Sequence, residues 1–157
     1  MIAFLAFDAR RATVDDAPEV ARLLFDFQTE YSEPVPELPV LTERIVQFIE
    51  RGEAVFLLAG TGPDGIAELR FRPSLMTGAL DAYLEELYVA PAKRGQGLGR
   101  ALLEGAMEAA REEGAARIEL GTGEDDLAAR ALYESAGFSN REGRPDGPLM
   151  FFYEREL

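Results

Sequence analysis

The sequence predicts an α/β (α+β) fold, with a mixed and mostly antiparallel sheet of about six or seven strands flanked by about four helices. Three observations favour it. Two amphipathic helical patterns come early in the chain, three strand-like segments joined by turns follow, and a strand–helix–strand pattern occupies the second half. Turns join antiparallel strands, whereas a crossover helix joins parallel ones, so this order gives a mixed sheet with helices on its faces.

The first helices are indicated by charge, proline and apolar spacing. Asp15 and Asp16 precede an apolar stripe, where their carboxylates favour a helix start. A proline-rich connection over residues 32–39 separates this helix from a second one over Leu41–Glu50, which ends at Gly52. We expect two consecutive helices before the meander.

The meander is predicted from three segments that have strand character. Ala54–Ala59 is a short apolar run, and Thr61–Gly65 has the composition of a turn. Ile66–Arg72 alternates in part, and Ala82–Val89 is the third strand. Adjacent strands joined this closely are expected to pair antiparallel.

The second half alternates helices and strands. A helix starting near Leu98 ends at Gly114, and a second one covers Asp125–Ala136. Three further strands are predicted over Ala116–Leu120, from Phe138 onward, and over Leu149–Glu154. The last strand fits the sheet core, and a homodimer interface is its alternative role.

Composition limits the classes of function. The 157 residues are expected to form one domain, residues 1–157, and 47% hydrophobic with 29% charged residues is typical of a globular chain. The 16 Lys and Arg residues against 29 Asp and Glu give a net charge of −13. Proteins that bind nucleic acids or anionic membranes use broad cationic faces, so neither partner is expected.

The chain has no Cys and no His. Disulfides, thiol nucleophiles, Cys/His zinc sites and Ser-His-Asp triads are therefore excluded, and no metal is expected. A general base has to be a carboxylate, a tyrosine, a neutral amine or water. The apolar run Met1–Phe7 is too short for a signal peptide or a membrane span, so we expect a cytoplasmic protein.

A glycine-rich turn follows the strand that ends at Val89. Gly95, Gly97 and Gly99 let the backbone approach a ligand, and the helix that starts there exposes its first amide groups. Such a helix N-terminus binds anions through its amides and its dipole.

Three cations lie in the same turn, namely Lys93, Arg94 and Arg100. A cationic turn in an acidic protein indicates a phosphate ligand. The turn lacks the G-x-x-x-x-G-K-[ST] of a Walker A loop, and the third glycine of a G-x-G-x-x-G fingerprint is replaced by Arg100.

A third phosphate motif fits. Arg94-x-x-Gly97-x-Gly99 matches the pattern [QR]-x-x-G-x-[GA], and Leu87-Tyr88-Val89 matches the L-x-V strand that precedes it. Downstream, a second motif with Asp in place of the usual Asn is matched by Asp126, Ala129, Tyr133, Gly137 and Phe138. Over residues 83–138 the chain resembles the GNAT N-acetyltransferase superfamily.

The resemblance implies that acetyl-CoA is the co-substrate, bound in a V-shaped cleft between the strands at 83–89 and 116–120. The pantetheine arm would pair with the strand backbone, and the pyrophosphate would rest on the amides of the glycine-rich turn. The cofactor-binding residues implied are Leu87, Tyr88, Val89, Arg94, Gly95, Gln96, Gly97, Leu98, Gly99, Arg100 and Asp126. A carboxylate cannot donate a hydrogen bond, so Asp126 has the alternative role of starting its helix.

Catalytic roles follow from the same resemblance. Tyr133 stands where relatives protonate the leaving thiolate, and a core aromatic is its alternative role. Glu85 matches the base position of spermidine/spermine acetyltransferases, which are similar here, with Glu86 as the other candidate. Strand alternation places these glutamates on opposite faces unless a bulge intervenes. A salt bridge from Glu85 to Arg70 or Arg72 is the structural alternative.

The expected function is therefore an N-acetyltransferase that moves an acetyl group from acetyl-CoA to a primary amine by direct attack in a ternary complex. The negative charge favours a cationic small molecule such as a polyamine, an aminoglycoside or an amino-acid derivative. Two alternatives remain open. One is a non-catalytic acyl-CoA-binding or regulatory domain, and the other is an acetyltransferase acting on protein N-termini or lysines.

Overall fold

The computed structural model describes residues 8–157, so the predicted absence of a leader or span in Met1–Phe7 falls outside the described residues. The chain divides into two compact units, Met1–Leu120 and Gly121–Leu157, and each is described by itself.

The first unit contains one five-stranded sheet in the order β1-β2-β3-β4-β5. Its strands are β1 (Arg10–Arg11), β2 (Ala54–Ala59), β3 (Gly65–Pro73), β4 (Leu80–Val89) and β5 (Ala115–Leu120). Neighbours pair antiparallel except β4 and β5, which pair parallel because α3 crosses between them. The mixed, mostly antiparallel sheet and the three-strand meander are confirmed.

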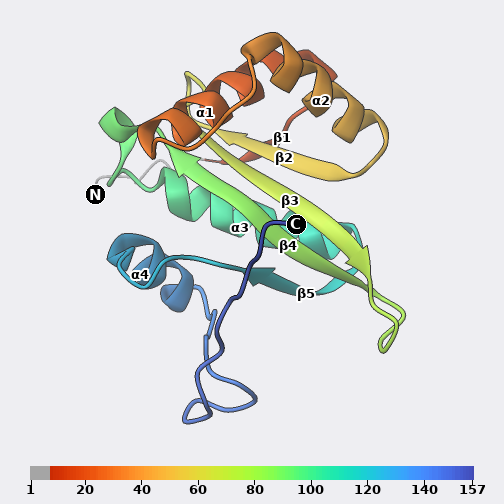
Figure 1. Ribbon diagram of the computed structural model, residues 1–157, viewed down its shortest axis with the longest axis vertical. Helices are drawn as coiled ribbons and strands as arrows, with labels where there is room; N and C mark the ends of the chain where they lie inside the picture. The colour runs from red at the N-terminus through yellow and green to blue at the C-terminus, as the bar shows by residue number, and fades with distance from the viewer. Residues whose placement is uncertain (1–7) are drawn as a thin grey trace, which may run out of the picture. The chain divides into compact units, whose positions relative to one another are not determined.

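Helices cover both faces of this sheet. Figure 1 shows α1 (Ala17–Glu30) and α2 (Leu38–Glu50) over one face and α3 (Leu98–Glu112) over the other. A short 3-10 turn, Val14–Asp16, precedes α1, and the Thr13 amide donates to the Asp16 carboxylate at 2.8 Å, which confirms the expected acidic helix start. A second 3-10 turn, Pro91–Lys93, follows β4.

The core on the α1 and α2 face is continuous. It includes Val20 and Leu23 from α1, Ile45 from α2, and Phe56 and Ile66 from the sheet, each at most 3% exposed. Burial of these side chains stabilises the packing of both helices on the strands. The connection at residues 31–37 is irregular, as its prolines predict.

The α3 face is closed by small and branched apolar residues. Leu102 and Leu103 of α3 are 0% and 1% exposed. A methyl group added at Gly105 would come within 2.8 Å of the Ala9 side chain, so this glycine allows α3 to lie close to the segment before β1. The same face holds Leu69, which is 0% exposed.

The second unit contains one helix, α4 (Leu127–Ser135). The predicted strands from Phe138 and over Leu149–Glu154 are wrong, because the described residues beyond 135 form only an isolated bridge between Arg141 and Leu149. The expected six or seven strands are corrected to five. A strand needs a hydrogen-bonded neighbour as well as apolar composition, and Leu149–Glu154 forms no ladder.

Candidate active site

A β-bulge interrupts β4 at its two glutamates. Glu86 pairs with Glu68 of β3, whereas the next pair along the ladder joins Leu84 with Leu69, so Glu85 is an extra residue on β4. An extra residue shifts the alternation of the strand by one position. The expectation of opposite faces, which holds only for an uninterrupted strand, therefore fails for Glu85 and Glu86.

Both glutamates lie on the face covered by α1 and α2. Tyr83 pairs with Arg70, and Glu85, two residues beyond Tyr83, shares the face of that pair. Glu86 shares the face of its partner Glu68, which lies two residues from Arg70 on β3. The bulge thus places three carboxylates on one face of two neighbouring strands.

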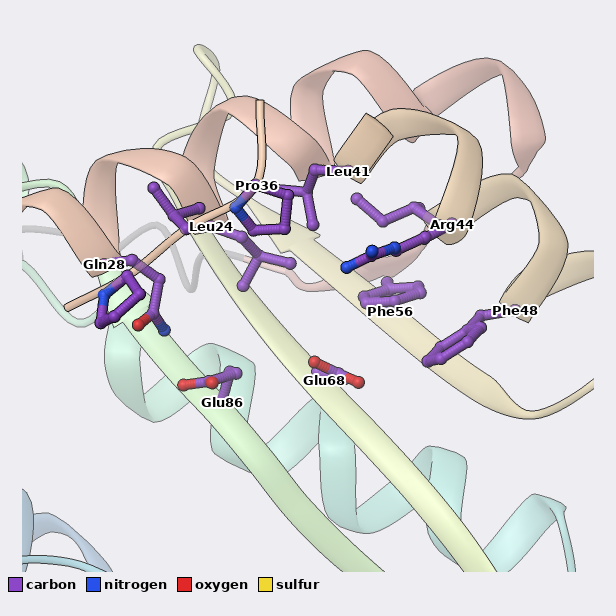
Figure 2. Close-up of a pocket in the computed structure, with 12 residues that line it drawn as sticks. Leu24, Gln28, Pro36, Leu41, Arg44, Phe48, Phe56, Glu68 and Glu86 are labelled. Carbon is purple, nitrogen blue, oxygen red and sulfur yellow. The ribbon is translucent and has the colours of Figure 1, made fainter. Parts of the chain in front are cut away.

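A cavity of about 400 Å³ lies between this face and the two helices. One side of it is apolar and is lined by Leu24, Leu41, Ile45, Phe48 and Phe56. Figure 2 shows Glu68 and Glu86 side by side on the sheet, facing the cavity from below, with Gln28 and Arg44 reaching it from the helices. The cavity combines an apolar wall with an acidic floor, a composition typical of small-molecule sites.

Glu68 is the most buried of these three glutamates, with 8% of its surface exposed. It accepts no hydrogen bond from residues 8–157. In that range, every oxygen of a non-exposed side chain either has a hydrogen-bond partner or remains in contact with solvent. Its carboxylate therefore opens into the cavity. Burial, reinforced by the charges of Glu85 and Glu86 and opposed by Arg70, raises the pKa of Glu68 to about 7.

Glu86 is half-buried beside Glu68. Burial, followed by the charge of Glu85, raises the pKa of Glu86 to about 7. Carboxylates directly opposite each other on antiparallel strands repel, so the fold retains this pair at a cost. Perturbed carboxylates that open into a cavity are candidates for proton transfer.

Glu85 has a different environment. It is exposed and lines a smaller cavity of about 140 Å³ together with Arg70, Tyr83 and Asp81. The salt bridge considered from the sequence does not form. The Arg70 Nε donates to the Glu53 carbonyl at 2.9 Å, and Arg72 pairs with Glu119 at 3.1 Å and with Asp81 at 3.7 Å.

Glu68 is the site residue that sequence reasoning missed. A signal for it exists in Ile66–Arg72, because Ile66 and Glu68 occupy alternate positions and therefore share a face. Ile66 belongs to the buried core, so a carboxylate two residues later lies on a covered face. An acidic residue in register with core positions is unusual enough to indicate a functional role.

The glycine-rich turn has the backbone geometry of an anion site. Gly95 and Gly97 have φ values of 74° and 96°, in the left-handed region that favours glycine, and Gly97 is the N-cap of α3. Within residues 8–157, the amides from Gly95 to Gly99 donate to no backbone carbonyl. These amides are available to a diphosphate, as the sequence motif predicts.

Arg94 connects this turn to α1. Its guanidinium donates to the Glu30 carboxylate at 2.7 Å and to the Val89 carbonyl at 2.9 Å, and it lies 5.6 Å from the centre of the Tyr88 ring. The side chain therefore braces the turn against α1 and β4. In this arrangement the Arg94 guanidinium already has a carboxylate partner, and its contact with a cofactor stays a prediction.

The strands β4 and β5 separate where the sequence motif predicts a cleft. Their parallel pairing ends at Leu84 and Leu120, and from Glu85 to Val89 the strand β4 pairs only with β3 among the described residues. The other edge of this segment retains backbone groups that no strand occupies. An extended ligand would add to that edge as a further strand.

The second unit carries the two remaining predicted residues. The Asp126 carboxylate accepts from the Ala129 amide at 3.1 Å as the N-cap of α4, so it starts its helix. Tyr133 is buried, with 9% of its surface exposed, and its ring centre lies 6.0 Å from that of Phe138. Contact of either residue with a cofactor stays a prediction.

Comparison with known proteins identifies the class. The model of the acetyltransferase (GNAT) family matches residues 20–138. An aminoglycoside N(6')-acetyltransferase type 1 of Stenotrophomonas maltophilia is 30% identical over 139 residues, which are 85% of this chain and 86% of that protein. The uncharacterized N-acetyltransferase YjgM of Escherichia coli is 33% identical over 140 residues, covering 83% and 81% of the two chains.

A solved structure agrees with these matches. A crystal structure of an acetyltransferase candidate from Arthrobacter sp. FB24 aligns with a TM-score of 0.87 and 41% identity over 95% of both chains. The chain therefore belongs to the GNAT acetyltransferase family, and its five-stranded mixed sheet with four helices is the GNAT fold. This family uses acetyl-CoA as its co-substrate.

The described residues offer neither a metal-binding cluster nor a membrane-spanning helix. Among residues 8–157, His, Cys, Asp and Glu form no group of three or more suited to holding a metal ion. None of the helices formed by these residues combines the length and the apolar character required to span a bilayer.

Proposed function

We propose that this protein transfers an acetyl group from acetyl-CoA to the primary amine of a small molecule, by direct attack within a ternary complex. The observation that carries the proposal is the cavity whose floor is formed by Glu68 and Glu86. Two adjacent carboxylates with a raised pKa suit an ammonium group, which they attract while charged and from which they accept a proton.

The proton balance explains why a base is needed. An alkylamine with a pKa of about 10.4 is protonated at pH 7, and presenting it neutral costs roughly 4–5 kcal/mol. A thiol with a pKa of about 8.5 requires only about 2 kcal/mol for its departure as thiolate. Removing a proton from the acceptor amine is therefore the more costly of the two proton transfers. With no Cys in the chain, an acyl-thiol enzyme intermediate is excluded.

Glu86 is the base that the cavity favours. It lies on β4 at the cavity floor, whereas Glu85, the residue favoured by sequence similarity, is exposed and lines the smaller cavity. Glu86 takes a proton from the incoming ammonium, and the neutral nitrogen then attacks the acetyl carbonyl. Glu68, directly opposite on β3, keeps the site acidic and holds the amine.

The cofactor side rests on the first unit's turn and strand edge. The amides of Gly95 to Gly99 bind the diphosphate, and the edge of β4 from Glu85 to Val89 receives the pantetheine arm. Tyr133 supplies the proton to the departing thiolate, a role proposed from its position in the second sequence motif. A cytoplasmic location is proposed with this activity, because acetyl-CoA is a metabolite of that compartment.

A screen of amines, monitored by release of free CoA, tests the proposal. We expect at least one small primary amine to release CoA and to form an equal amount of N-acetyl product. Tyr133→Phe is expected to lower kcat about 100-fold, within the usual range for loss of a general acid, with little change in acetyl-CoA affinity. Full turnover in Tyr133→Phe removes Tyr133 from the mechanism.

Two results in this screen favour other functions. Tight acetyl-CoA binding with no product from any amine favours a non-catalytic binding domain. Turnover confined to peptide N-termini or lysines favours a protein-directed enzyme. The cavity volume of about 400 Å³, near the lower end of the roughly 300–1,000 Å³ usual for ligand pockets, supports a small acceptor.

A further inference from the structure

One cation lines the larger cavity, and it has no carboxylate partner. Arg44 belongs to α2, and Figure 2 shows its guanidinium extending across the cavity beside Phe56, above Glu68. Within the described part of the chain, no hydrogen bond or ion pair holds this guanidinium. In a chain with 29 acidic residues, a cation left without a carboxylate inside a cavity requires explanation.

The acidic floor is likewise left without a neutralising partner. Glu86 forms no ion pair with any described residue, and Glu68 is opposed only by the more distant charge of Arg70. The cavity therefore has a negative region on the sheet and a positive region on α2. Beside both regions lies an apolar wall that includes Phe48 and Phe56. A ligand complementary to all three regions carries an ammonium, an anion and an apolar group.

We propose that the acceptor is a free α-amino acid with an apolar or aromatic side chain, whose carboxylate is bound by Arg44 and whose amino group lies on Glu68 and Glu86. This inference rests on the proposed function and specifies its substrate class. A guanidinium donates two parallel hydrogen bonds to the two oxygens of a carboxylate. An ammonium or hydroxyl group of a ligand cannot accept this pair of bonds. Phe48 and Phe56 receive the side chain.

The same arrangement disfavours a polycation. In a polyamine or an aminoglycoside, one ammonium would occupy the acidic floor, and a further one would approach the guanidinium of Arg44. Two like charges at this distance repel, and among the described residues no carboxylate paired with Arg44 offsets the repulsion. The net charge of −13 attracts every cation from a distance, so discrimination depends on Arg44.

Matched acceptor pairs test the inference. L-Phenylalanine is compared with phenethylamine and L-leucine with isopentylamine, with spermidine and kanamycin as polycations. We expect kcat/KM for each amino acid to exceed that for its decarboxylated amine by about tenfold or more, the usual effect of a charge-assisted hydrogen bond. In Arg44→Met this ratio is expected to fall to about one, because the amino acid loses its contact and the plain amine does not.

Arg51→Met is the matched control. Arg51 is the C-cap of the same helix, is exposed and lines neither cavity, so its substitution is expected to leave the ratio unchanged. Arg44→Lys keeps the charge but loses the paired geometry, and an intermediate ratio is expected. Arg44 is exposed on a helix surface, and methionine keeps its apolar stem, so both variants are expected to fold.

Calorimetric titration of L-phenylalanine into the protein with CoA present separates the two proposals. Binding to wild type but not to Arg44→Met, together with no CoA release from acetyl-CoA in the screen of amines, supports the amino-acid site and contradicts the transferase. Turnover of phenethylamine, spermidine or kanamycin at least as efficient as that of the amino acids overturns the amino-acid site and leaves the transferase intact. An unchanged ratio in Arg44→Met, or no calorimetric binding of the amino acid to wild type, also overturns it.

Discussion

The two faces of the sheet use neighbouring residues for opposite purposes. On β3, Leu69 is 0% exposed on the face that α3 covers, whereas Glu68 lies on the face of α1 and α2 and opens into a cavity. Both side chains are largely removed from bulk water, yet one is apolar and the other ionisable. One face thus supplies stability, and the other gives up some stability to hold carboxylates in a site.

The same contrast continues on β4. Leu84 is 4% exposed and pairs with Leu69 on the α3 face, and beyond it the bulge at Glu85 restarts the alternation. In a regular ladder without the bulge, Glu85 would pair with Glu68 and Glu86 would lie on the α3 face. The bulge therefore places Glu86 opposite Glu68 and keeps Glu85 on the same face, at the point where β5 leaves β4.

Removing the carboxylate of Glu86 is expected to have the largest effect on the face of the sheet that holds the site. We expect Glu86→Gln to lower kcat/KM about 100-fold or more, because the amine then has no base. Wild-type kcat/KM is expected to rise with pH through about 7, where Glu86 and Glu68 lose their protons, and only a smaller rise from Glu68 is expected in the variant. Initial rates of CoA release between pH 5.5 and 9 provide the measurement.

Glu85→Gln is the matched control for that experiment. Glu85 carries the same charge on the adjacent residue but lines the smaller cavity, so most activity is expected to remain. Its substitution removes a charge that raises the pKa of Glu86, and the pH limb is expected to move to lower pH. The opposite pattern, with Glu85→Gln inactive and Glu86→Gln active, identifies Glu85 as the general base.

Creating a cavity on the α3 face tests whether this face contributes to stability alone. Leu69→Ala is expected to lower the free energy of unfolding by about 3 kcal/mol, the usual cost of truncating a fully buried leucine. This loss is expected to be the same at pH 5 and pH 8, since no titratable group is involved. Urea denaturation measures it, and Leu75→Ala, at an exposed position, is the control. A strongly pH-dependent loss contradicts the assignment of this face to stability alone.

The sequence predicts the elements whose signals are local. The bounds of β2 agree residue for residue with the apolar run Ala54–Ala59, and α3 begins at Leu98 directly after the N-cap Gly97. Glycine spacing and strand composition are properties of short segments, so the turn and the strand before it are recognisable without a structure.

Features that depend on pairing between segments are not predictable in this way. The bulge exists only relative to the register of β3, and the cavity requires α2 to place Arg44 opposite strands far along the chain. The apolar run Leu149–Glu154 shows the converse failure, because strand composition without a ladder partner gives no strand. Glu68 combines both lessons, since its own strand indicates its face but only β4 provides its acidic partner.

Glu68→Gln tests directly what the acidic face costs in stability, and its effect is confined to neutral and alkaline pH. The pKa of Glu68 is about 7 in the folded protein, above its ordinary value of 4.5, so the folded state binds this proton more tightly than the unfolded chain. Below pH 4.5, ionisation of Glu68 is therefore expected to leave the free energy of unfolding of wild type unchanged. As the pH rises through 7, this free energy is expected to decline. Glutamine stays neutral, so the variant is expected to be more stable by about 3 kcal/mol at pH 8 and close to wild type near pH 4.5. Urea denaturation across this range measures the difference, and a variant less stable than wild type at pH 8 would mean that the charged carboxylate stabilises this face after all.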